Sequence, residues 1–435
     1  MITVSPIHLS TSRYRQQVEN LLGQDLGFHN ETSANGRHNM HAFPAKFPPQ
    51  LPRLFIEALT LPGDVVLDPM MGSGTTIVET LAAGRHAIGF DIDPLAVRIC
   101  GIKVSQLASG LAYEAGRRVA EQAAYLLNEQ RAAVERELST RFGPRTAEFI
   151  EYWFAPKTRL ELMALLMAIE TMPARQVRKF LELVFSAVII TKSGGVSLAR
   201  DLAHTRPHRV ADKVPRPAID EFVKRLEKNA KSLLTERDSG GSALILFGNA
   251  ENLPLASHSA DLLVTSPPYA SNAIDYMRAH KFSLVWLGHA LTDLSALRNR
   301  YVGGEATTGF EFAPLPKRTA DIVEQVSKAD RKKGLALKRY YSEISRVLDE
   351  AWRVLKPGRA GIFVVGSSVM RGIDTRTQHC LGEIGQAVGF DLVGIALRQL
   401  DRDRRMMPAR FGKQRSSQIE ERMHEEYVIA LLKPA

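Results

Sequence analysis

The sequence predicts an α/β fold with a Rossmann-like, mostly parallel sheet that is interrupted by a helical insertion. Short apolar runs bounded by turn signals recur early in the chain and again in its second half, and such runs are typical of buried strands. Between them, residues 105–242 carry helical spacing without strand alternation. The 435 residues leave room for two or three domains, at roughly 150 residues for each.

The first part of the sheet is expected within residues 38–104, after a polar and weakly patterned lead-in over residues 1–37. Its elements are expected to be a helix over 51–59, a strand over 65–67, a helix over 75–83 and a strand over 86–90. The two strands end at Asp68 and Asp91, and a glycine-rich turn follows the first of them. Strand, helix and strand form one βαβ unit, a crossover that is nearly always right-handed.

The second part of the sheet is expected within residues 243–435. Its predicted elements are strands over 243–247, 261–264 and 362–365, a helix over 341–355, and a terminal hairpin of 390–397 with 427–432. Residues 270–340 are polar and irregular, with helical pieces. Within the insertion, helices are predicted over 113–138, 160–172 and 177–190.

The composition indicates a reduced, cytoplasmic protein with a polyanionic partner. Lys and Arg number 57 and Asp and Glu number 47, which gives a net charge of +10. A basic surplus favours a nucleic acid or an anionic surface without choosing between them. The longest apolar stretches are much shorter than the ~18–20 residues of a membrane span. Two cysteines exclude a disulfide framework and the usual zinc fingers, and no metal site is expected.

The glycine-rich turn is the segment Asp68–Thr76 (DPMMGSGTT). Gly72 and Gly74 allow a tight turn in which a ligand meets bare backbone, and the following helix offers unpaired N–H groups. Asp91 stands 23 residues after Asp68, which is the usual spacing of an acid that grips a ribose hydroxyl pair. The turn is not a P-loop, because no Lys follows its glycines. A plain strand-to-helix turn with a surface Asp is the alternative interpretation.

Two further segments carry chemistry. Thr265–Tyr269 (TSPPY) follows a predicted strand, and its two prolines hold a rigid turn at the carboxyl edge of the sheet, where ligands bind. Its alternative interpretation is a strand stop with a packing Tyr. Phe43–Pro48 (FPAKFP) is dense in prolines and aromatics, which predicts a loop. The alternative there is a surface loop whose Phe43 and Phe47 are anchored in the core.

Together these segments resemble the S-adenosylmethionine-dependent amino-methyltransferases of DNA, which methylate N4 of cytosine or N6 of adenine. Asp68–Thr76 looks like the cofactor loop of that family, and Thr265–Tyr269 looks like its catalytic motif, in the serine form most often associated with N4-cytosine enzymes. Phe43–Leu51 is similar to the segment that covers the methionine end of the cofactor, and Gly248–Pro254 to the segment that meets the adenine ring. In this chain the cofactor loop precedes the catalytic motif, whereas serine-type enzymes often have the reverse order.

The resemblance implies a seven-stranded methyltransferase sheet with a C-terminal antiparallel hairpin, S-adenosylmethionine as the cofactor and double-stranded DNA as the substrate. The residues that it implies for cofactor binding are Phe43, Phe47, Asp68, Pro69, Gly72, Ser73, Gly74, Thr75, Asp91, Asn249 and Thr265. The residues that it implies for catalysis are Ser266, Pro267, Pro268 and Tyr269. A companion restriction or defence component is a further partner that such an enzyme can have.

Several alternatives stay open at the level of sequence. N4 of cytosine is the favoured acceptor, and N6 of adenine is the alternative within the same family. An RNA methyltransferase acting on guanine N2 or adenine N6 shares the sheet and a Pro-Pro-Tyr turn, and a catalytically silent nucleic-acid-binding subunit keeps the fold. The intact loop and turn weigh against the silent subunit. Neither Cys100 nor Cys380 lies in a motif, which argues against the thiolate route to 5-methylcytosine.

Target recognition is assigned by elimination to the insertion, residues 105–242, together with residues 270–340. The basic candidates for contact with nucleic acid are Arg206, Arg209, Lys332, Lys333, Arg404 and Arg405. For each of these groups a solvated surface is the alternative interpretation. For the insertion the alternative is an element of stability or oligomerisation, because a fold pattern alone does not fix function.

Overall fold

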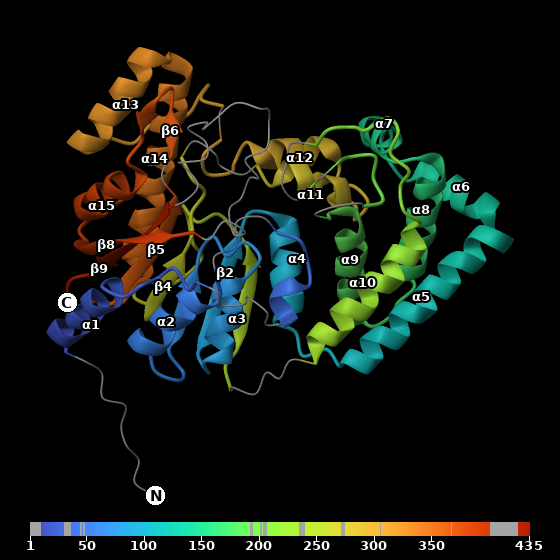
Figure 1. Ribbon diagram of the computed structural model, residues 1–435, viewed down its shortest axis with the longest axis horizontal. Helices are drawn as coiled ribbons and strands as arrows, with labels where there is room; N and C mark the ends of the chain where they lie inside the picture. The colour runs from blue at the N-terminus through green and yellow to red at the C-terminus, as the bar shows by residue number, and fades with distance from the viewer. Residues whose placement is uncertain are drawn as a thin grey trace, which may run out of the picture.

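The computed structural model describes residues 10–29, 36–43, 46, 48–191, 195–200, 202, 207–234, 240–270, 275–304, 306–366, 368–400 and 425–435. At its centre is a seven-stranded sheet in the order β3-β2-β1-β4-β5-β9-β8, with helices on both faces and a lobe of helices beside it (Figure 1). The predicted fold class is therefore confirmed.

The first five strands of this order run parallel, and the last two add an antiparallel hairpin. In chain order the strands are β1 (Val65–Asp68), β2 (His86–Asp91), β3 (Ala243–Phe247), β4 (Leu262–Thr265), β5 (Ala360–Gly366), β8 (Asp391–Gln399) and β9 (Glu425–Leu432). β9 lies antiparallel between β5 and β8, so the predicted terminal hairpin is present. A separate antiparallel pair consists of β6 (Val369–Met370) and β7 (Ile373–Asp374).

The centre of the sheet is the place where the strand order reverses. β1 and β4 are neighbours there, although a long stretch of chain separates them. Ligands of open α/β sheets bind outside the carboxyl ends of the strands at such a reversal. Asp68 ends β1 and Thr265 ends β4, so the glycine turn and the TSPPY segment begin at the same edge.

Each face of the sheet has its own hydrophobic core, because successive residues of a strand point to opposite faces. Leu262 and Val264 of β4 pack toward α1 and α2, whereas Leu263 between them packs toward α14 and α15. The helices against the sheet are α1 (Thr11–Leu22), α2 (Gln50–Leu59), α3 (Thr75–Ala82), α4 (Pro94–Lys103), α13 (Lys317–Ala329), α14 (Arg331–Val354) and α15 (Thr377–Val388). A short 3₁₀ helix, η1 (Gly36–Asn39), precedes α2.

The N-terminal segment differs from its predicted form. Residues 1–37 were expected to be a polar lead-in, but residues 11–22 form α1 and pack on α2, β8 and β9. Tyr14, Val18 and Leu21 are its buried residues, and they lie on one side because they are four and three positions apart. With only three large buried side chains among polar neighbours, the helical spacing was too sparse to be recognised.

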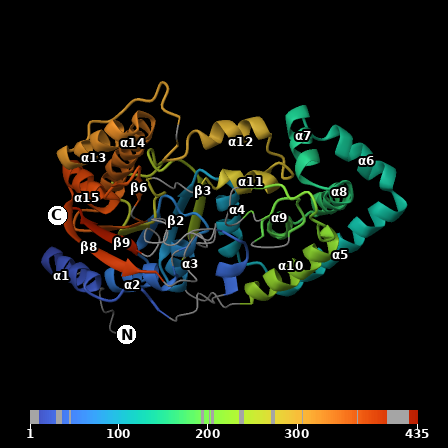
Figure 2. The same cartoon turned by 45° about the horizontal axis from the view of Figure 1, so that its top comes forward.

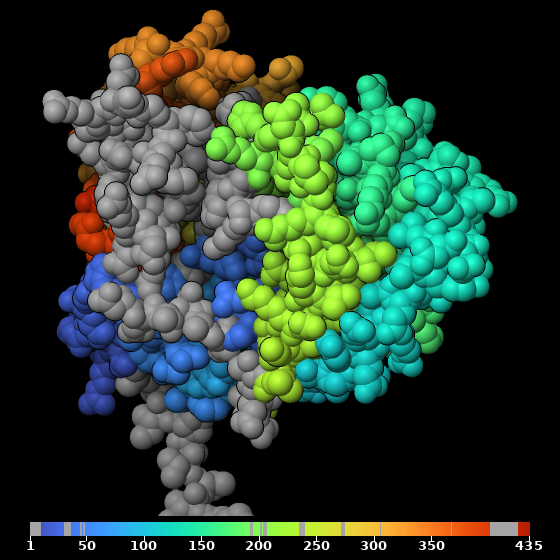
Figure 3. All heavy atoms as spheres, turned by 45° about the vertical axis from the view of Figure 1, so that its right-hand side comes forward, coloured from blue at the N-terminus to red at the C-terminus, as the bar shows by residue number. Residues whose placement is uncertain are grey.

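In the described part of the insertion, six helices form a lobe beside the sheet (Figures 1 and 2). They are α5 (Ser109–Glu129), α6 (Arg131–Thr140), α7 (Pro144–Trp153), α8 (Pro156–Glu170), α9 (Arg175–Ile189) and α10 (Ala218–Leu233). The single helix predicted over 113–138 is two helices, which meet where the backbone of Gln130 leaves the helical region. The space-filling view shows this lobe side by side with the sheet domain (Figure 3).

The lobe is joined to the edge of the sheet where the strands end. Its core includes Phe282 of α11 (Met277–Leu284) and Trp286, which lies just after that helix. It also includes Leu294 of α12 (Leu291–Arg298). These residues come shortly after the TSPPY segment in the chain. The insertion is therefore packed on the segment that leaves the candidate site.

Among the described residues, no helix is both long and apolar enough for a membrane crossing.

Candidate active site

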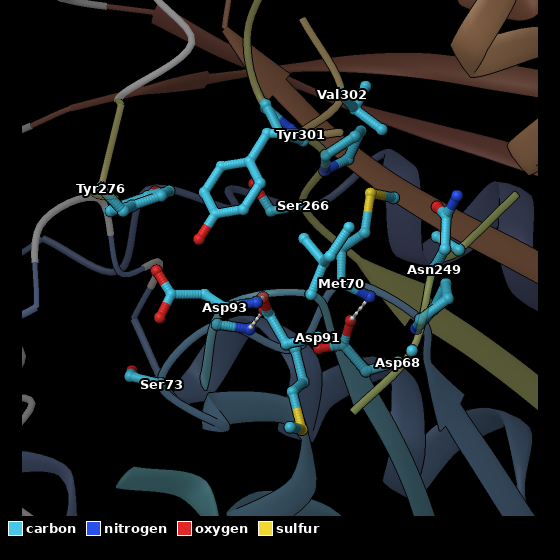
Figure 4. A pocket seen from close by; sticks show the side chains of 18 of the residues that line it. Asp68, Met70, Ser73, Asp91, Asp93, Asn249, Ser266, Tyr276, Tyr301 and Val302 are labelled. Atoms are coloured by element: carbon cyan, nitrogen blue, oxygen red, sulfur yellow. Dashed lines mark hydrogen bonds between the residues drawn. The ribbon is translucent and has the colours of Figure 1, made fainter. Parts of the chain in front are cut away.

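One pocket opens at the carboxyl edge of the sheet, beside the reversal between β1 and β4 (Figure 4). The predicted site residues that line it are Phe43, Asp68, Pro69, Gly72, Ser73, Thr75, Asp91, Asn249, Ser266, Pro267, Pro268 and Tyr269. The structure thus brings most of the predicted cofactor and catalytic residues into one cavity.

The glycine turn forms the floor of the pocket and is held by the acid that ends β2. Asp91 Oδ2 accepts a hydrogen bond from the Gly72 N–H at 2.8 Å, and Asp91 Oδ1 accepts one from the Asp93 N–H at 2.8 Å. Gly72 has a φ of +50°, and a side chain there would meet the ring of Phe43 at 3.2 Å. Asp91 therefore shapes the turn, and it still has lone pairs that can accept hydrogen bonds from a ligand.

Gly74 and Thr265 support the pocket from behind and are not among its lining residues. Gly74 has a φ of +80°, and a Cβ built on it would lie 2.4 Å from Cys100 Sγ of α4. The bare side of Gly74 therefore faces a helix, whereas the sequence pattern predicted a ligand there. The buried Thr265 hydroxyl donates a hydrogen bond to Asp68 Oδ1 at 2.7 Å, which orients that carboxyl group.

Three acids, Asp68, Asp91 and Asp93, line the same pocket. Burial raises the pKa of Asp68 to about 6. Burial, followed by the charge of Asp93, raises the pKa of Asp91 to about 7. Burial also acts on Asp93, but the charge of His280 and its hydrogen bond outweigh it and hold the pKa of Asp93 below its usual value. A ligand that carries positive charge would stabilise the ionised carboxylates of Asp68 and Asp91.

An aromatic wall closes the pocket on the side of the helical lobe. The ring centres of Phe43 and Tyr276 are 4.9 Å apart and stacked, and those of Tyr276 and His280 are 5.8 Å apart. His280 is fully buried in α11, and its Nδ1 lies 2.7 Å from Asp93 Oδ2. Sequence reasoning found Phe43 but missed Tyr276, His280 and Asp93, because no motif connects them to the glycine turn.

Polar contacts hold the segment before Phe43 to both the sheet domain and the lobe. His38 Nε2 lies 2.7 Å from Glu79 Oε1 of α3, and both side chains are buried. His41 Nε2 lies 2.9 Å from the Ser186 hydroxyl of α9, which in turn lies 2.9 Å from the Ser283 hydroxyl of α11. The wall of the pocket is therefore fixed to the insertion as well as to the sheet.

The roof of the pocket comes from the segment after α12. Tyr301 lines the cavity, and its hydroxyl points toward the acids (Figure 4). Two buried residues of α14 anchor the segment: Arg339 Nη2 donates to the Asn299 carbonyl at 2.8 Å, and Glu343 Oε2 accepts from the Gly303 N–H at 2.7 Å. These residues gave no signal in the sequence, since the segment around Tyr301 has no recognisable motif.

Three predicted nucleic-acid contacts are described by the structure, and none of these three lines the pocket. Arg209 is exposed and lies over the ring of Tyr152 at 5.0 Å. Lys332 is exposed and Lys333 half-buried in the first turn of α14. Phe47, Arg206, Arg404 and Arg405, which were also predicted from the sequence, lie outside the described residues.

The residues of the pocket fit S-adenosylmethionine. Its sulfonium and ammonium groups are positive, and the acids at the ends of β1 and β2 are the matching groups. Asp91 is the candidate for the ribose hydroxyls, Asn249 lies at the end of the cavity next to β3, and Phe43 is the apolar cover. No cluster of His, Cys, Asp and Glu suited to a metal ion occurs among the residues described here.

The N-terminal part of the chain matches a family model described as DNA methylase, N6/N4, over residues 14–100. Over 384 residues the chain is 23% identical to the type II methyltransferase M.MvaI of Kocuria varians, covering 83% of each protein. It is 24% identical over 365 residues to M.AvaI of Nostoc, covering 75% of this chain and 73% of that protein. It is 23% identical over 408 residues to M.BsoBI of Geobacillus stearothermophilus, covering 82% of this chain and 79% of that protein.

Solved structures of methyltransferases superpose only loosely. A SAM-dependent methyltransferase from Methanosarcina mazei has a TM-score of 0.32 at 11% identity, covering 88% of this chain and 98% of that chain. The rRNA methyltransferase aviRa from Streptomyces viridochromogenes has a TM-score of 0.29 at 10% identity, covering 96% of this chain and 95% of that chain. Over residues 14–100 the chain therefore resembles the N6/N4 DNA methylases, and over 75–83% of its length it is similar to type II methyltransferases.

Proposed function

We propose that this protein transfers a methyl group from S-adenosylmethionine to the exocyclic amine of a flipped base in double-stranded DNA, with N4 of cytosine as the favoured acceptor. The observation that supports this most strongly is the joint presence of the glycine turn and the Ser266–Tyr269 turn in one cavity. The serine form of the turn favours cytosine, and the same hydrogen-bond acceptors would also serve N6 of adenine. A companion restriction or defence component stays a prediction.

The chemistry asked of the protein is positioning. The amine of a nucleobase is a poor nucleophile because its lone pair is delocalised into the ring. The Ser266 oxygen and the Pro267 carbonyl accept hydrogen bonds from that amine and aim its lone pair, while the ring of Tyr269 stacks on the base. The bound cofactor supplies an electrophilic methyl group. In-line positioning of the two reactants can contribute up to ~7–11 kcal/mol without a covalent intermediate.

The target base must leave the duplex to reach the pocket, and its unstacking costs a few kcal/mol. Phosphate contacts by basic side chains offset this, and the net charge of +10 is suited to them. We assign the reading of flanking bases to the insertion and to residues 270–340. Residues 270–340 line the pocket at Tyr276 and Tyr301, and the insertion packs on α11 beside it.

A labelled-methyl experiment tests the proposal. Purified protein with tritiated S-adenosylmethionine is expected to label unmethylated bacterial DNA and to leave an equal mass of total RNA unlabelled. Digestion of the labelled DNA to nucleosides would identify the product as N4-methylcytosine or N6-methyladenine. Label in RNA alone would contradict the proposal and favour the RNA enzyme. Protein that binds S-adenosylmethionine but labels neither polymer would favour the silent subunit.

The affinity for S-adenosylmethionine is expected to increase with pH between about 5.5 and 8. Asp68 and Asp91, with pKa values of about 6 and 7, are held protonated at low pH by burial, and a cationic ligand favours their ionised forms. Below its pKa, each of these carboxyl groups should lower the affinity by up to about tenfold per pH unit. Calorimetric titrations across this range measure the effect. A dissociation constant that does not change between pH 5.5 and 8 would contradict it.

Salt dependence separates phosphate contacts from base contacts. Replacing Lys332 and Lys333 with Ala is expected to weaken DNA binding uniformly and to reduce the slope of log affinity against log salt by about 1 for each phosphate that is no longer neutralised. Replacing Arg206 and Arg209 is expected to act in the same way, or to relax the methylated sequence if either side chain reads a base. Unchanged affinity, salt slope and methylated site in both double variants would remove these residues from the interface.

A further inference from the structure

We infer that Glu426 and Arg398, from the C-terminal hairpin, are positioning residues for Tyr269, and that they hold its ring in the orientation in which it meets the target base. The inference rests on the proposed function, because it concerns the same catalytic turn. Neither residue belongs to the cofactor loop or to the TSPPY segment. They lie on β8 and β9, at the far end of the chain from the glycine turn.

The hydroxyl group of Tyr269 is fixed by a hydrogen bond. It donates to Glu426 Oε1 at 2.7 Å, and Glu426 is the second residue of β9. Burial, reinforced by the charge of Glu426, raises the pKa of the Tyr269 hydroxyl well above its usual value. The group therefore stays a neutral donor at physiological pH, and the carboxylate is its acceptor.

The ring of Tyr269 is fixed by close packing on Gly366, the last residue of β5. A Cβ built on Gly366 would lie 2.6 Å from Cε2 and 2.8 Å from Cδ2 of Tyr269. The ring thus rests directly on bare backbone on that side, while Tyr269 also lines the pocket. With one side packed on Gly366 and its hydroxyl anchored, the ring has little freedom to rotate.

A buried ion pair holds the anchor itself. Arg398 Nη1 donates to Glu426 Oε2 at 2.6 Å, and the guanidinium side chain is only 1% exposed. Arg398 Nε also donates to the Leu26 carbonyl, after α1, at 3.1 Å. A charge this deeply buried costs stability unless it is paired, so the pairing commits Arg398 to Glu426 and not to a surface contact with DNA. Tyr269, Glu426 and Arg398 form one chain of charge-assisted hydrogen bonds.

The arrangement has a consequence for catalysis. Stacking on a base requires a ring of defined plane, and misplacement of a reacting group by about 1 Å can cost on the order of 100-fold in rate. The acceptors for the amine, the Ser266 oxygen and the Pro267 carbonyl, are in the same rigid turn as Tyr269. An anchor on the Tyr269 hydroxyl therefore sets how the base lies relative to those acceptors, without touching the cofactor.

The test compares Tyr269→Phe, Glu426→Gln and Glu426→Ala in the full-length protein, with saturating DNA and S-adenosylmethionine. Tyr269→Phe and Glu426→Ala are each expected to lower the single-turnover rate of methyl transfer by roughly 10–100-fold. The affinity for S-adenosylmethionine should stay near that of the wild type. Glu426→Gln keeps an acceptor for the hydroxyl and should recover much of the rate. Tyr269→Phe combined with Glu426→Ala should be no slower than the slower single variant, because both remove one interaction.

Glu425→Ala is the matched control. Glu425 precedes Glu426 on β9, and its carboxylate contacts Gln399 and Tyr427 instead of Tyr269. This variant should keep the wild-type rate. A wild-type rate in both Tyr269→Phe and Glu426→Ala would overturn the inference while leaving the proposed function intact. If Glu426→Ala is unfolded in thermal melts, Tyr269→Phe alone decides, since it leaves the Glu426–Arg398 pair in place. A wild-type protein that methylates no DNA would overturn both.

Discussion

Replacing Ser266 with Ala is expected to reduce methyl transfer by about 100-fold, and replacing Tyr269 with Ala to weaken productive base binding by ~1–3 kcal/mol. Ser266→Ala removes an acceptor for the target amine, and Tyr269→Ala removes the stacking surface. Both residues line the pocket and are absent from the hydrogen bonds of the glycine turn. S-adenosylmethionine should therefore bind to both variants with near wild-type affinity. Single-turnover assays and calorimetry measure the two quantities separately.

Asn249→Ala is the useful contrast to these variants. Asn249 lines the far end of the pocket, next to β3, and is the residue expected at the adenine ring. Its loss should weaken cofactor binding and leave the transfer rate at saturating cofactor nearly unchanged. If Ser266→Ala and Tyr269→Ala both methylate DNA at the wild-type rate, the catalytic turn lies elsewhere in the molecule.

Replacing Gly74 with Val is expected to lower the free energy of unfolding by about 2–5 kcal/mol and to abolish detectable cofactor binding. Two effects add. The φ of +80° disfavours any residue with a Cβ, and that Cβ would lie 2.4 Å from Cys100 Sγ and 3.0 Å from its Cβ. Relief of the overlap would move α4 or the turn, and the turn is the floor of the pocket. Denaturant unfolding and calorimetry measure the two losses.

A double substitution separates the overlap from the backbone strain. Gly74→Ala with Cys100→Gly removes the Sγ and Cβ atoms that the new methyl group would meet, so it should be more stable than Gly74→Ala alone. Gly101→Ala, one residue further along α4, adds a methyl group with no atom within 4 Å and should not destabilise the protein. Wild-type stability and cofactor affinity in Gly74→Val would contradict this account of the turn.

The centre of the sheet could be predicted because β4 and β5, and most of β1, are buried on both faces. Runs such as Ile362–Val365 are continuous and apolar, and their ends carry the polar residues that make the site. The same property made the cavity predictable, since Asp68, Asp91 and Ser266 all follow strands and the carboxyl ends of parallel strands share one edge. Local apolar patterns, together with the rule that parallel strands share one carboxyl edge, were sufficient to predict these strands and the cavity.

The remainder of the site depends on contacts that leave no local pattern. Tyr276 lines the pocket and packs on the buried His280 only because the insertion and α11 share a core. Arg339 lies in a run of basic residues typical of a surface, yet it is 5% exposed and anchors the roof. Arg398 likewise precedes a basic segment but is buried against Glu426. Burial of a charged side chain is decided by a partner distant in sequence, so spacing alone could not reveal it.

Single-molecule sequencing of DNA from cells that express this protein tests the central claim most directly, because it reports the modified base and its sequence context together. The account predicts one methylated amine, N4 of cytosine in the favoured case, within a defined recognition sequence, and no such mark in cells that express Ser266→Ala. DNA without any modified base, from cells in which the folded protein binds S-adenosylmethionine, would contradict it.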